Sequence, residues 1–257
     1  MSTDKQSIDW YNQNAQHYTD HVRNPDDSIY HSLYEKPAMY GLLPDLQDKS
    51  VVSLGCGSGE DCEFLRSCGA SKVVGIDISE SMIGFAKNSY PECDFAVMDM
   101  ENLAFENESF DFAYSSLAVH YIEDWTKLFA DTHRVLKPGG SFLFSCNHPV
   151  YSALETSRND DDMKVRELSR TLDKKTDSAT IVGNYTKRRP VTLDTGMAVT
   201  TWHKSIGEIT HEATSAGFVI TDILEPQPLP AMEKVAPKDY ETLTKIPNFI
   251  VFKLQKL

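Results

Sequence analysis

Positive charge is scarce in this sequence. It holds 25 Lys and Arg against 38 Asp and Glu, which gives a net charge of −13 and an isoelectric point near 5.0. A polyanion would be repelled by this mean field, so we expect no nucleic-acid partner. No apolar run reaches the ~18 residues of a membrane span, and the N-terminus lacks the apolar core of a secretory signal. We therefore expect no membrane span and a cytoplasmic location.

Cysteine is also scarce, and its number is odd. The five cysteines lie in or beside predicted strands and helices, which argues against a disulfide framework and fits a reducing compartment. Cys62 and Cys68 are too far apart for a C-x-x-C pair, so we expect no metal site. The chain has no internal repeat and no low-complexity tract. Its 257 residues, 40% of them hydrophobic, suffice for a single large α/β domain over residues 1–257.

Strand and helix patterns alternate along most of the chain, which predicts a mostly parallel sheet covered by helices. Strands are predicted at residues 50–54, 72–76, 93–97, 110–114, 141–146, 218–224 and 248–255. Helices are predicted at residues 4–22, 29–41, 60–68, 79–88 and 124–136. The last strand follows closely on Pro247 and Asn248, which favours an antiparallel strand at the end of the sheet.

The most informative stretch is VVSLGCGSGED, an apolar strand that runs into glycines at positions 55, 57 and 59. Glycine is needed where the backbone turns sharply or comes close to a ligand. The helix that follows offers free N–H groups at its start. Asp77 ends the next apolar strand about 20 residues further on, where a carboxylate can accept both hydroxyls of a ribose. The spacing predicts a site for a nucleoside cofactor.

The glycine spacing departs from the dinucleotide pattern, because Glu60 stands where a third glycine would fall. A carboxylate beside the turn repels a pyrophosphate and suits a ligand with an ammonium or sulfonium group. S-adenosyl-L-methionine carries both groups and a ribose, and its product would be S-adenosyl-L-homocysteine. A nicotinamide oxidoreductase and a tight turn without any ligand are the weaker alternatives.

Four stretches resemble class I S-adenosylmethionine-dependent methyltransferases of the ubiquinone/menaquinone-biosynthesis-like (methyltransferase type 11) group. They occur in family order between residues 50 and 147: VVSLGCGSGED, VVGIDISESMI, the tip Met98-Asp99-Met100, and FDFAYSSLAVHYIEDW followed by RVLKPGG. The resemblance implies a Rossmann-like, seven-stranded, mostly parallel sheet in the order 3-2-1-4-5-7-6. It also implies an antiparallel last strand and helices on both faces.

This interpretation divides the chain into four parts: a helical lid at 1–45, a cofactor-binding core at 46–147, a substrate-region insert at 148–203, and the rest of the sheet at 204–257. The insert does not continue the alternation of strands and helices. Its two β-like pieces, 179–185 and 191–202, predict an inserted β-hairpin region over the carboxyl edge of the sheet, where ligands bind in open α/β folds.

The residues of the motif predict a first set of cofactor contacts. The backbone of the glycine turn borders the methionine end of the cofactor, and the apolar side chains after Asp77 can sandwich the adenine. In chain order these predicted contacts are Gly55, Cys56, Gly57, Gly59, Asp77, Ile78 and Met82. For Ile78 and Met82, ordinary core packing is an equal alternative.

The resemblance adds a second set. It implies that the Asp99 carboxylate lies near the adenine amino group and that the Met100 N–H lies at a ring nitrogen. The backbone of Ser115 and Ser116 would border the methionine moiety. Tyr18 resembles the family's lid tyrosine, although an aromatic residue on an apolar helix face is an equal alternative.

A reactive sulfonium methyl needs little from the protein beyond alignment of a nucleophile and exclusion of water. A base is required only if the acceptor must lose a proton, and His120 is the candidate for that role. The candidate acceptor contacts are His148, Tyr185, Arg188 and His203. The basic Arg188 region suggests a carboxylate or phenolate acceptor, while a solvated basic tip and structural histidines are the plainer alternatives.

The sequence thus predicts a methyltransferase that uses S-adenosyl-L-methionine and methylates O, N or C of a small molecule. A methyltransferase acting on tRNA or protein and a non-catalytic binding protein for the same cofactor are the alternatives. The acceptor and the oligomeric state are not specified by the sequence.

Overall fold

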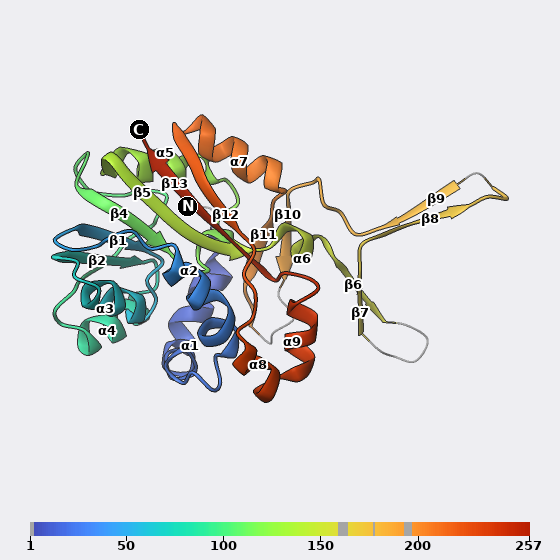
Figure 1. Cartoon of the computed structure of the whole chain (residues 1–257), viewed down its shortest axis with the longest axis horizontal. Helices are drawn as coiled ribbons and strands as arrows, with labels where there is room; N and C mark the ends of the chain where they lie inside the picture. Colours follow the sequence, from blue (N-terminus) through green and yellow to red (C-terminus); the bar gives the residue numbers. More distant parts are fainter. Residues whose placement is uncertain (1–2, 159–163, 177, 193–196) are drawn as a thin grey trace.

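The central sheet has the strand order β12-β13-β5-β4-β1-β2-β3 (Figure 1). The computed structural model describes residues 3–158, 164–176, 178–192 and 197–257. The strands of this sheet are β1 Ser50–Leu54, β2 Lys72–Asp77, β3 Asp94–Val97, β4 Phe110–Ser115, β5 Leu136–Asn147, β12 Phe218–Leu224 and β13 Phe249–Lys256. Strands β1 to β5 are parallel, and β13 runs antiparallel between β5 and β12. The predicted order and the antiparallel last strand are confirmed.

Strand β5 begins at Leu136, five residues before the predicted strand at 141–146. The residues Lys137–Gly140, which fall between the predicted helix at 124–136 and the predicted strand, are part of β5. Leu136 pairs with Phe110, whereas the next pair is Ser141 with Phe112, so the ladder contains an irregularity that takes up the extra residues. Gly139 supplies the positive φ, 77°, that this irregularity uses.

Helices cover both faces of the sheet, as predicted (Figure 1). Helices α5 Trp125–Val135 and α7 Ile206–Ser215 pack on one face. On the other face lie α2 Lys36–Gly41, α3 Glu60–Ser67 and α4 Glu80–Ser89. The predicted helix at 29–41 contains a π-helical turn, η1 His31–Glu35, before α2. Short helices α8 Pro230–Val235 and α9 Pro237–Leu243 pack on this turn through Met232, Leu243 and Tyr34.

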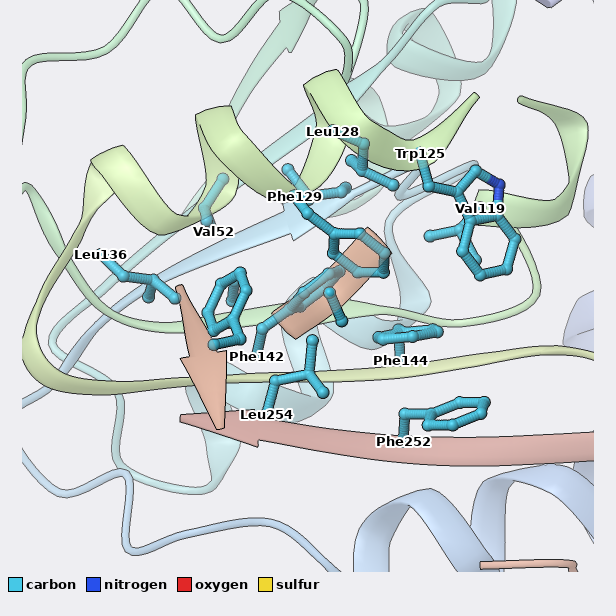
Figure 2. Close-up of a cluster of buried hydrophobic side chains, with 14 of the residues drawn as sticks. Val52, Val119, Trp125, Leu128, Phe129, Leu136, Phe142, Phe144, Phe252 and Leu254 are labelled. Atoms are coloured by element: carbon cyan, nitrogen blue, oxygen red, sulfur yellow. The ribbon is translucent and has the colours of Figure 1, made fainter. Parts of the chain in front are cut away.

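An aromatic core lies between α5 and the sheet (Figure 2). Trp125 and Phe129 of α5 contact Phe144 of β5 with ring centroids 5.9 and 5.7 Å apart, and Phe252 of β13 stacks on Phe144 at 5.2 Å. Each of these side chains is almost fully buried, which contributes about 1.5–3 kcal/mol per large apolar side chain. This packing fixes the carboxyl ends of β4 and β5, where the site lies.

The insert contains one short helix, α6 Pro149–Ala153, and three two-stranded ladders within its described residues. The ladders join β6 Glu155–Arg158 to β7 Lys164–Glu167, β8 Ser169–Asp173 to β9 Ser178–Val182, and β10 Arg189–Thr192 to β11 Thr200–His203. The β-hairpin region is therefore present, but the two predicted pieces do not pair with each other. The first piece pairs with the adjacent β8, because a short loop closes at a smaller entropy cost than a long one.

Among the hydrogen bonds of the described residues, one joins the β10–β11 ladder to α1 Lys5–Arg23 at the carboxyl edge of the sheet. The Thr200 N–H at the start of β11 donates to Ser7 Oγ of α1 at 3.0 Å. The β8–β9 ladder instead projects away from the body (Figure 1). No described helix is both long and apolar enough to cross a membrane. Nor do three or more His, Cys, Asp or Glu side chains of the described ranges come together in a way that could hold a metal ion.

Candidate functional site

Two adjoining pockets lie at the carboxyl ends of the parallel strands, the position at which open α/β sheets bind ligands. The larger pocket encloses about 610 Å³ of empty space and the smaller about 380 Å³, part of each open to solvent. Both volumes are typical of sites for small molecules. The residues that line both pockets are Tyr18, Gly55, Gly57 and Ser116. The pockets therefore form one continuous site around the glycine turn.

The glycine turn after β1 forms the floor of this site. The Cys56 N–H donates to the Ile76 carbonyl at 2.9 Å, which anchors the turn to β2. Gly55 has φ 68°, and a Cβ at this position would lie 2.4 Å from the Ala118 Cβ. Only glycine allows so close an approach between the two loops. Gly57 lines both pockets, and Cys56 lines the smaller one.

Asp77 ends β2 and lines the larger pocket together with Ile78, and its contact with a ribose stays a prediction. Its Oδ2 accepts from the Gly57 N–H and its Oδ1 from the Ser79 N–H, each at 2.9 Å. Burial raises the pKa of Asp77, and the backbone N–H donors oppose that rise. A carboxylate offers about four lone-pair positions, so each oxygen keeps capacity for a ligand hydroxyl.

A buried carboxyl group holds the wall opposite the glycine turn. Glu35 has no exposed surface, and its Oε1 accepts from Ser116 Oγ at 3.0 Å and from Ser145 Oγ at 2.5 Å. Ser145 Oγ in turn accepts from the Leu117 N–H at 2.9 Å. Leu117 has φ 49°, a conformation that is costly for a branched residue. Glu35, placed by the π-helical turn, thus stabilises the strained loop that lines the pocket.

Three tyrosines border the larger pocket. Tyr11 and Tyr18 of α1 pack edge to face at 5.2 Å, and Tyr11 packs in the same way on Tyr121 at 5.7 Å. The hydroxyl oxygens of Tyr11 and Tyr121 are 2.6 Å apart. Burial raises the pKa of Tyr11 and of Tyr18, and it raises the pKa of Tyr121 to about 12. All three phenols are therefore neutral near pH 7.

Helix α1 is fastened over the site at two points. Asn12 Oδ1 accepts from Ser79 Oγ at 2.8 Å and from the Ser81 N–H at 3.2 Å, at the start of α4. Near the other end of α1, the Arg23 guanidinium donates to Glu60 Oε1 at 2.6 Å. Met82 of α4 and Met100 complete the apolar lining beneath the helix. Residues of this helix therefore line the pocket, and its role as a lid stays a prediction.

Opposite charges line the smaller pocket. Lys36 forms an ion pair with Asp61, and their side chains are only 15% and 13% exposed. Burial works against the charge of Lys36, but Asp61 and Glu35 outweigh it and raise the Lys36 pKa. His31 also lines this pocket; burial lowers its pKa to about 4, and its buried Nδ1 has no hydrogen-bond partner in the protein.

Some predicted cofactor residues line neither pocket. Gly59 begins α3, where a Cβ would lie 2.9 Å from the Phe95 ring, so this glycine serves helix packing. Ser115 Oγ donates to the Leu54 carbonyl at 2.8 Å and joins β4 to β1. Asp99 Oδ1 accepts from the Glu101 N–H at 2.9 Å. Contacts of Gly59, Ser115 and Asp99 with a cofactor stay predictions.

His120 is buried behind the site and lines neither pocket. Its Nδ1 accepts from the Asn147 N–H at 3.4 Å, between the ends of β4 and β5. Burial lowers the pKa of His120 to about 3, so it is neutral near pH 7. The geometry described here gives His120 a structural place, and a catalytic role for it stays a prediction.

The four predicted acceptor contacts also line neither pocket. Arg188 donates to Glu208 Oε1 and Glu212 Oε1, both at 2.7 Å. The remaining three are His148, Tyr185 and His203. His148 caps α6 by accepting from the backbone and lies 3.1 Å from Glu225. His203 Nε2 donates to the Tyr185 carbonyl at 2.8 Å, so its Nδ1 accepts from Ser152 Oγ at 2.7 Å.

Several pocket residues escaped the sequence analysis. They include Thr3, Ser7, Ile8, Val22, His31, Lys36, Ser58, Leu117, Ala118 and Tyr121. Leu117 to Tyr121 lie within the matched stretch SSLAVHYIEDW, directly after Ser116, so that stretch carried a usable signal. The N-terminal residues carry no spacing that would place them at the sheet edge.

The strand order, the helices on both faces and the two pockets at the carboxyl edge define a protein of the Rossmann-like α/β class. Residues 52–144 match the family model described as "Methyltransferase domain". This range contains the glycine turn, Asp77 and the loop at Ser116. A solved S-adenosylmethionine-dependent methyltransferase from Mesorhizobium loti matches with a TM-score of 0.74 and 28% identity, covering 90% of this chain and 100% of that one.

Two curated proteins are also similar. An uncharacterized protein of Haemophilus influenzae is 29% identical over 234 residues, 88% of each chain. Phthiotriol/phenolphthiotriol dimycocerosates methyltransferase 1 of Mycobacterium ulcerans is 30% identical over 141 residues, 54% of this chain and 51% of that protein. The chain thus matches about half the length of the mycobacterial enzyme. The predicted resemblance to class I S-adenosylmethionine-dependent methyltransferases of the type 11 group is confirmed.

Proposed function

We propose that this chain transfers the methyl group of S-adenosyl-L-methionine to O, N or C of a small-molecule acceptor. The observation that supports the proposal is the continuous site around the glycine turn. It places the Asp77 carboxylate, three tyrosines and a charged pocket at the carboxyl edge of one sheet. When bound, the cofactor supplies a sulfonium methyl that is open to in-line attack by a nucleophile.

The lining of the site fits the parts of this cofactor. Asp77 keeps acceptor capacity for the two ribose hydroxyls. Apolar side chains of the larger pocket, Ile78, Met82 and Met100, offer surfaces for the adenine. The smaller pocket carries both charge signs, which matches a zwitterionic amino-acid head group. We assign Lys36 to its carboxylate and Asp61 to its ammonium, so that binding exchanges one ion pair for two.

The chain's own contribution to the reaction is alignment and exclusion of water. Tyr18 and Tyr11 cover the larger pocket from α1 as part of the proposed lid at residues 1–45. Among the described residues that line this pocket, none is Lys, Arg or His, and Asp77 already accepts two backbone hydrogen bonds. The larger pocket therefore suits an acceptor whose nucleophile needs no basic side chain from its lining.

The structure does not support the basic tip as a grip for an anionic acceptor. Arg188 is paired with two glutamates, and Arg189 donates to the Ser152 carbonyl at 3.0 Å. We keep the division into lid, core at 46–147, insert at 148–203 and C-terminal part at 204–257 as part of the proposal, together with a cytoplasmic location. A small molecule is favoured over tRNA because the larger pocket is walled by tyrosines and apolar side chains rather than by cations.

Calorimetry with S-adenosyl-L-homocysteine and with adenosine tests the proposed site. The wild type should bind both ligands. Lys36→Met should weaken the binding of S-adenosyl-L-homocysteine by about 10- to 100-fold, as expected for one lost charge-assisted bond, and leave adenosine unchanged. The matched control is Lys137→Met, because Lys137 pairs with Asp111 near the start of β4, away from both pockets.

An equal loss of both ligands in Lys36→Met would reject the head-group assignment. No heat from the wild type with S-adenosyl-L-homocysteine would reject the whole proposal. Transfer is measured as S-adenosyl-L-homocysteine formed in the presence of small-molecule fractions, with and without nuclease treatment. Activity that survives nuclease and is absent from protein fractions supports a small-molecule acceptor, whereas activity lost with nuclease supports tRNA.

A further inference from the structure

The β8–β9 ladder forms an arm that projects from the body of the molecule (Figure 1). It has five cross-strand pairs, from Ser169 with Val182 to Asp173 with Ser178, and no third strand pairs with it in the described chain. An isolated two-stranded ribbon is only marginally stable in water and usually needs a further strand or a packed face. This arm therefore lacks the support that such ribbons require.

The register of the arm separates an apolar face from a polar one, because cross-strand partners lie on the same face. Leu172 pairs with Ala179 and Arg170 with Ile181, whereas Thr171 pairs with Thr180 on the opposite face. Leu172 is 57% and Ile181 is 68% exposed. This alternation is typical of a half-buried strand, but no described part of the same chain covers the apolar face.

Charge separates the arm region from the rest of the chain. The arm, Ser169–Val182, contains three Lys or Arg and two Asp, a net charge of +1 within a chain of net charge −13, which leaves −14 for the remainder. Lys174 and Lys175 lie exposed at the end of the arm. A second copy of the chain therefore presents the arm with a body of opposite charge.

The body also has an uncovered surface that complements the arm. Strand β12 is an edge of the central sheet, and its Val219 and Ile223 are 41% and 48% exposed. The acidic residues Asp222 and Glu225 are exposed beside them. An open edge strand with apolar side chains is a template for pairing with another chain unless something covers it. The arm is apolar and basic, whereas this edge is apolar and acidic.

We propose that the β8–β9 arm docks on a second copy of this chain, with its apolar face and basic end against the β12 edge of the partner. In a two-fold symmetric dimer, the arm of each copy docks on the β12 edge of the other copy. Both arms and both edges are then buried. A nucleic acid is disfavoured as the occupant, because Leu172 and Ile181 would meet phosphates and gain nothing from them.

Molar mass from light scattering during gel filtration tests the proposal. The wild type should elute as a dimer, and the pair Leu172→Asp with Ile181→Asp should elute as a monomer. The matched control is Thr171→Asp with Thr180→Asp, which places two negative charges on the polar face of the same two strands. The melting temperature of each variant, measured by thermal unfolding, checks that the central domain is intact. A monomeric wild type, or equal masses for the two double variants, would overturn the proposal.

A reciprocal variant locates the receiving surface. Ile223→Asp on β12 should also give a monomer. A mixture of the arm variant and the Ile223→Asp variant should recover part of the dimer, because one intact arm meets one intact edge. No recovery, or a dimer that persists in Ile223→Asp, excludes the β12 edge. A wild type that stays monomeric and binds RNA at the arm would instead assign the arm to a nucleic acid. None of these measurements depends on cofactor binding or catalysis.

Discussion

Replacing Asp77 with asparagine tests the central contact of the site. In the structure each carboxylate oxygen accepts one backbone N–H, from Gly57 and from Ser79, and keeps one position for a ligand hydroxyl. Asparagine has the same shape but only one acceptor oxygen, so it loses the charge and at least one ribose contact. Hydrogen bonds to a charged group contribute about 1.5–3 kcal/mol each, so we expect about 10- to 100-fold weaker binding of S-adenosyl-L-homocysteine.

A double-mutant cycle separates the ribose contact from other consequences of the substitution. Calorimetry compares S-adenosyl-L-homocysteine with its 2′-deoxy analogue, on the wild type and on Asp77→Asn. The wild type should bind the analogue about 10- to 100-fold more weakly, since one charge-assisted bond is lost. The variant should barely distinguish the two ligands, because the acceptor of that bond has been removed.

The control for this cycle is Asp111→Asn. Asp111 lies in β4 and accepts from Lys137 Nζ at 2.8 Å, and it lines neither pocket. This variant should lose stability and keep full discrimination between the two ligands. If Asp77→Asn folds normally and still discriminates like the wild type, the assignment of Asp77 to the ribose is refuted.

Two further substitutions follow from the packing. Gly55→Ala should destabilise the protein by at least about 1–2 kcal/mol in urea unfolding, because φ is 68° and the new Cβ would lie 2.4 Å from the Ala118 Cβ. A Cβ at Gly84 would have no atom within 4 Å, so Gly84→Ala should stabilise helix α4 by about 0.5–1 kcal/mol. A similar loss of stability in Gly55→Ala and Gly84→Ala would contradict this account. Burial lowers the pKa of His120 to about 3. Between pH 6.5 and 3 the unfolded chain therefore binds more protons than the folded chain, and the free energy of unfolding falls as the pH falls. The slope from this group is at most about 1.4 kcal/mol per pH unit. His120→Gln should make that slope shallower, although His31, whose pKa is lowered to about 4, still contributes to it. His211→Gln, at an exposed position, should leave the slope unchanged, and a slope unchanged by His120→Gln would show that His120 does not contribute.

The sheet was predictable because its signals are local. Each parallel strand is a short apolar run, and the glycine turn and Asp77 directly follow two of them. The stretch Lys137–Gly140, between a predicted helix and a predicted strand, was the exception. Its residues favour a turn in isolation, but pairing of Leu136 with Phe110 extends β5 backwards through them. Here the burial of Leu136 and Phe110 against the aromatic core outweighs the local preference.

The site was only partly predictable, because its remaining residues come from segments that carry no pattern. Lys36 and His31 reach the smaller pocket through a π-helical turn, which places Glu35 beneath the loop at Ser116. Nothing in the spacing of HSLYEK indicates that turn. The tertiary hydrogen bonds of Glu35 to Ser116 and Ser145 hold it in place, and these become visible only when the strands are assembled.

Arg188 shows why charged side chains are the hardest to assign from sequence. Sequence gives the sign of a charge but not whether another side chain already neutralises it. Glu208 and Glu212 lie one helical turn apart on α7, so their carboxylates converge on the single guanidinium of Arg188. Lys204 joins the same cluster by donating to Glu212. An anionic acceptor would have to displace two carboxylates to reach Arg188. Lys36 has to exchange only one carboxylate partner, Asp61, to bind an anion. Two basic side chains thus have different roles, a structural one for Arg188 and a candidate binding one for Lys36.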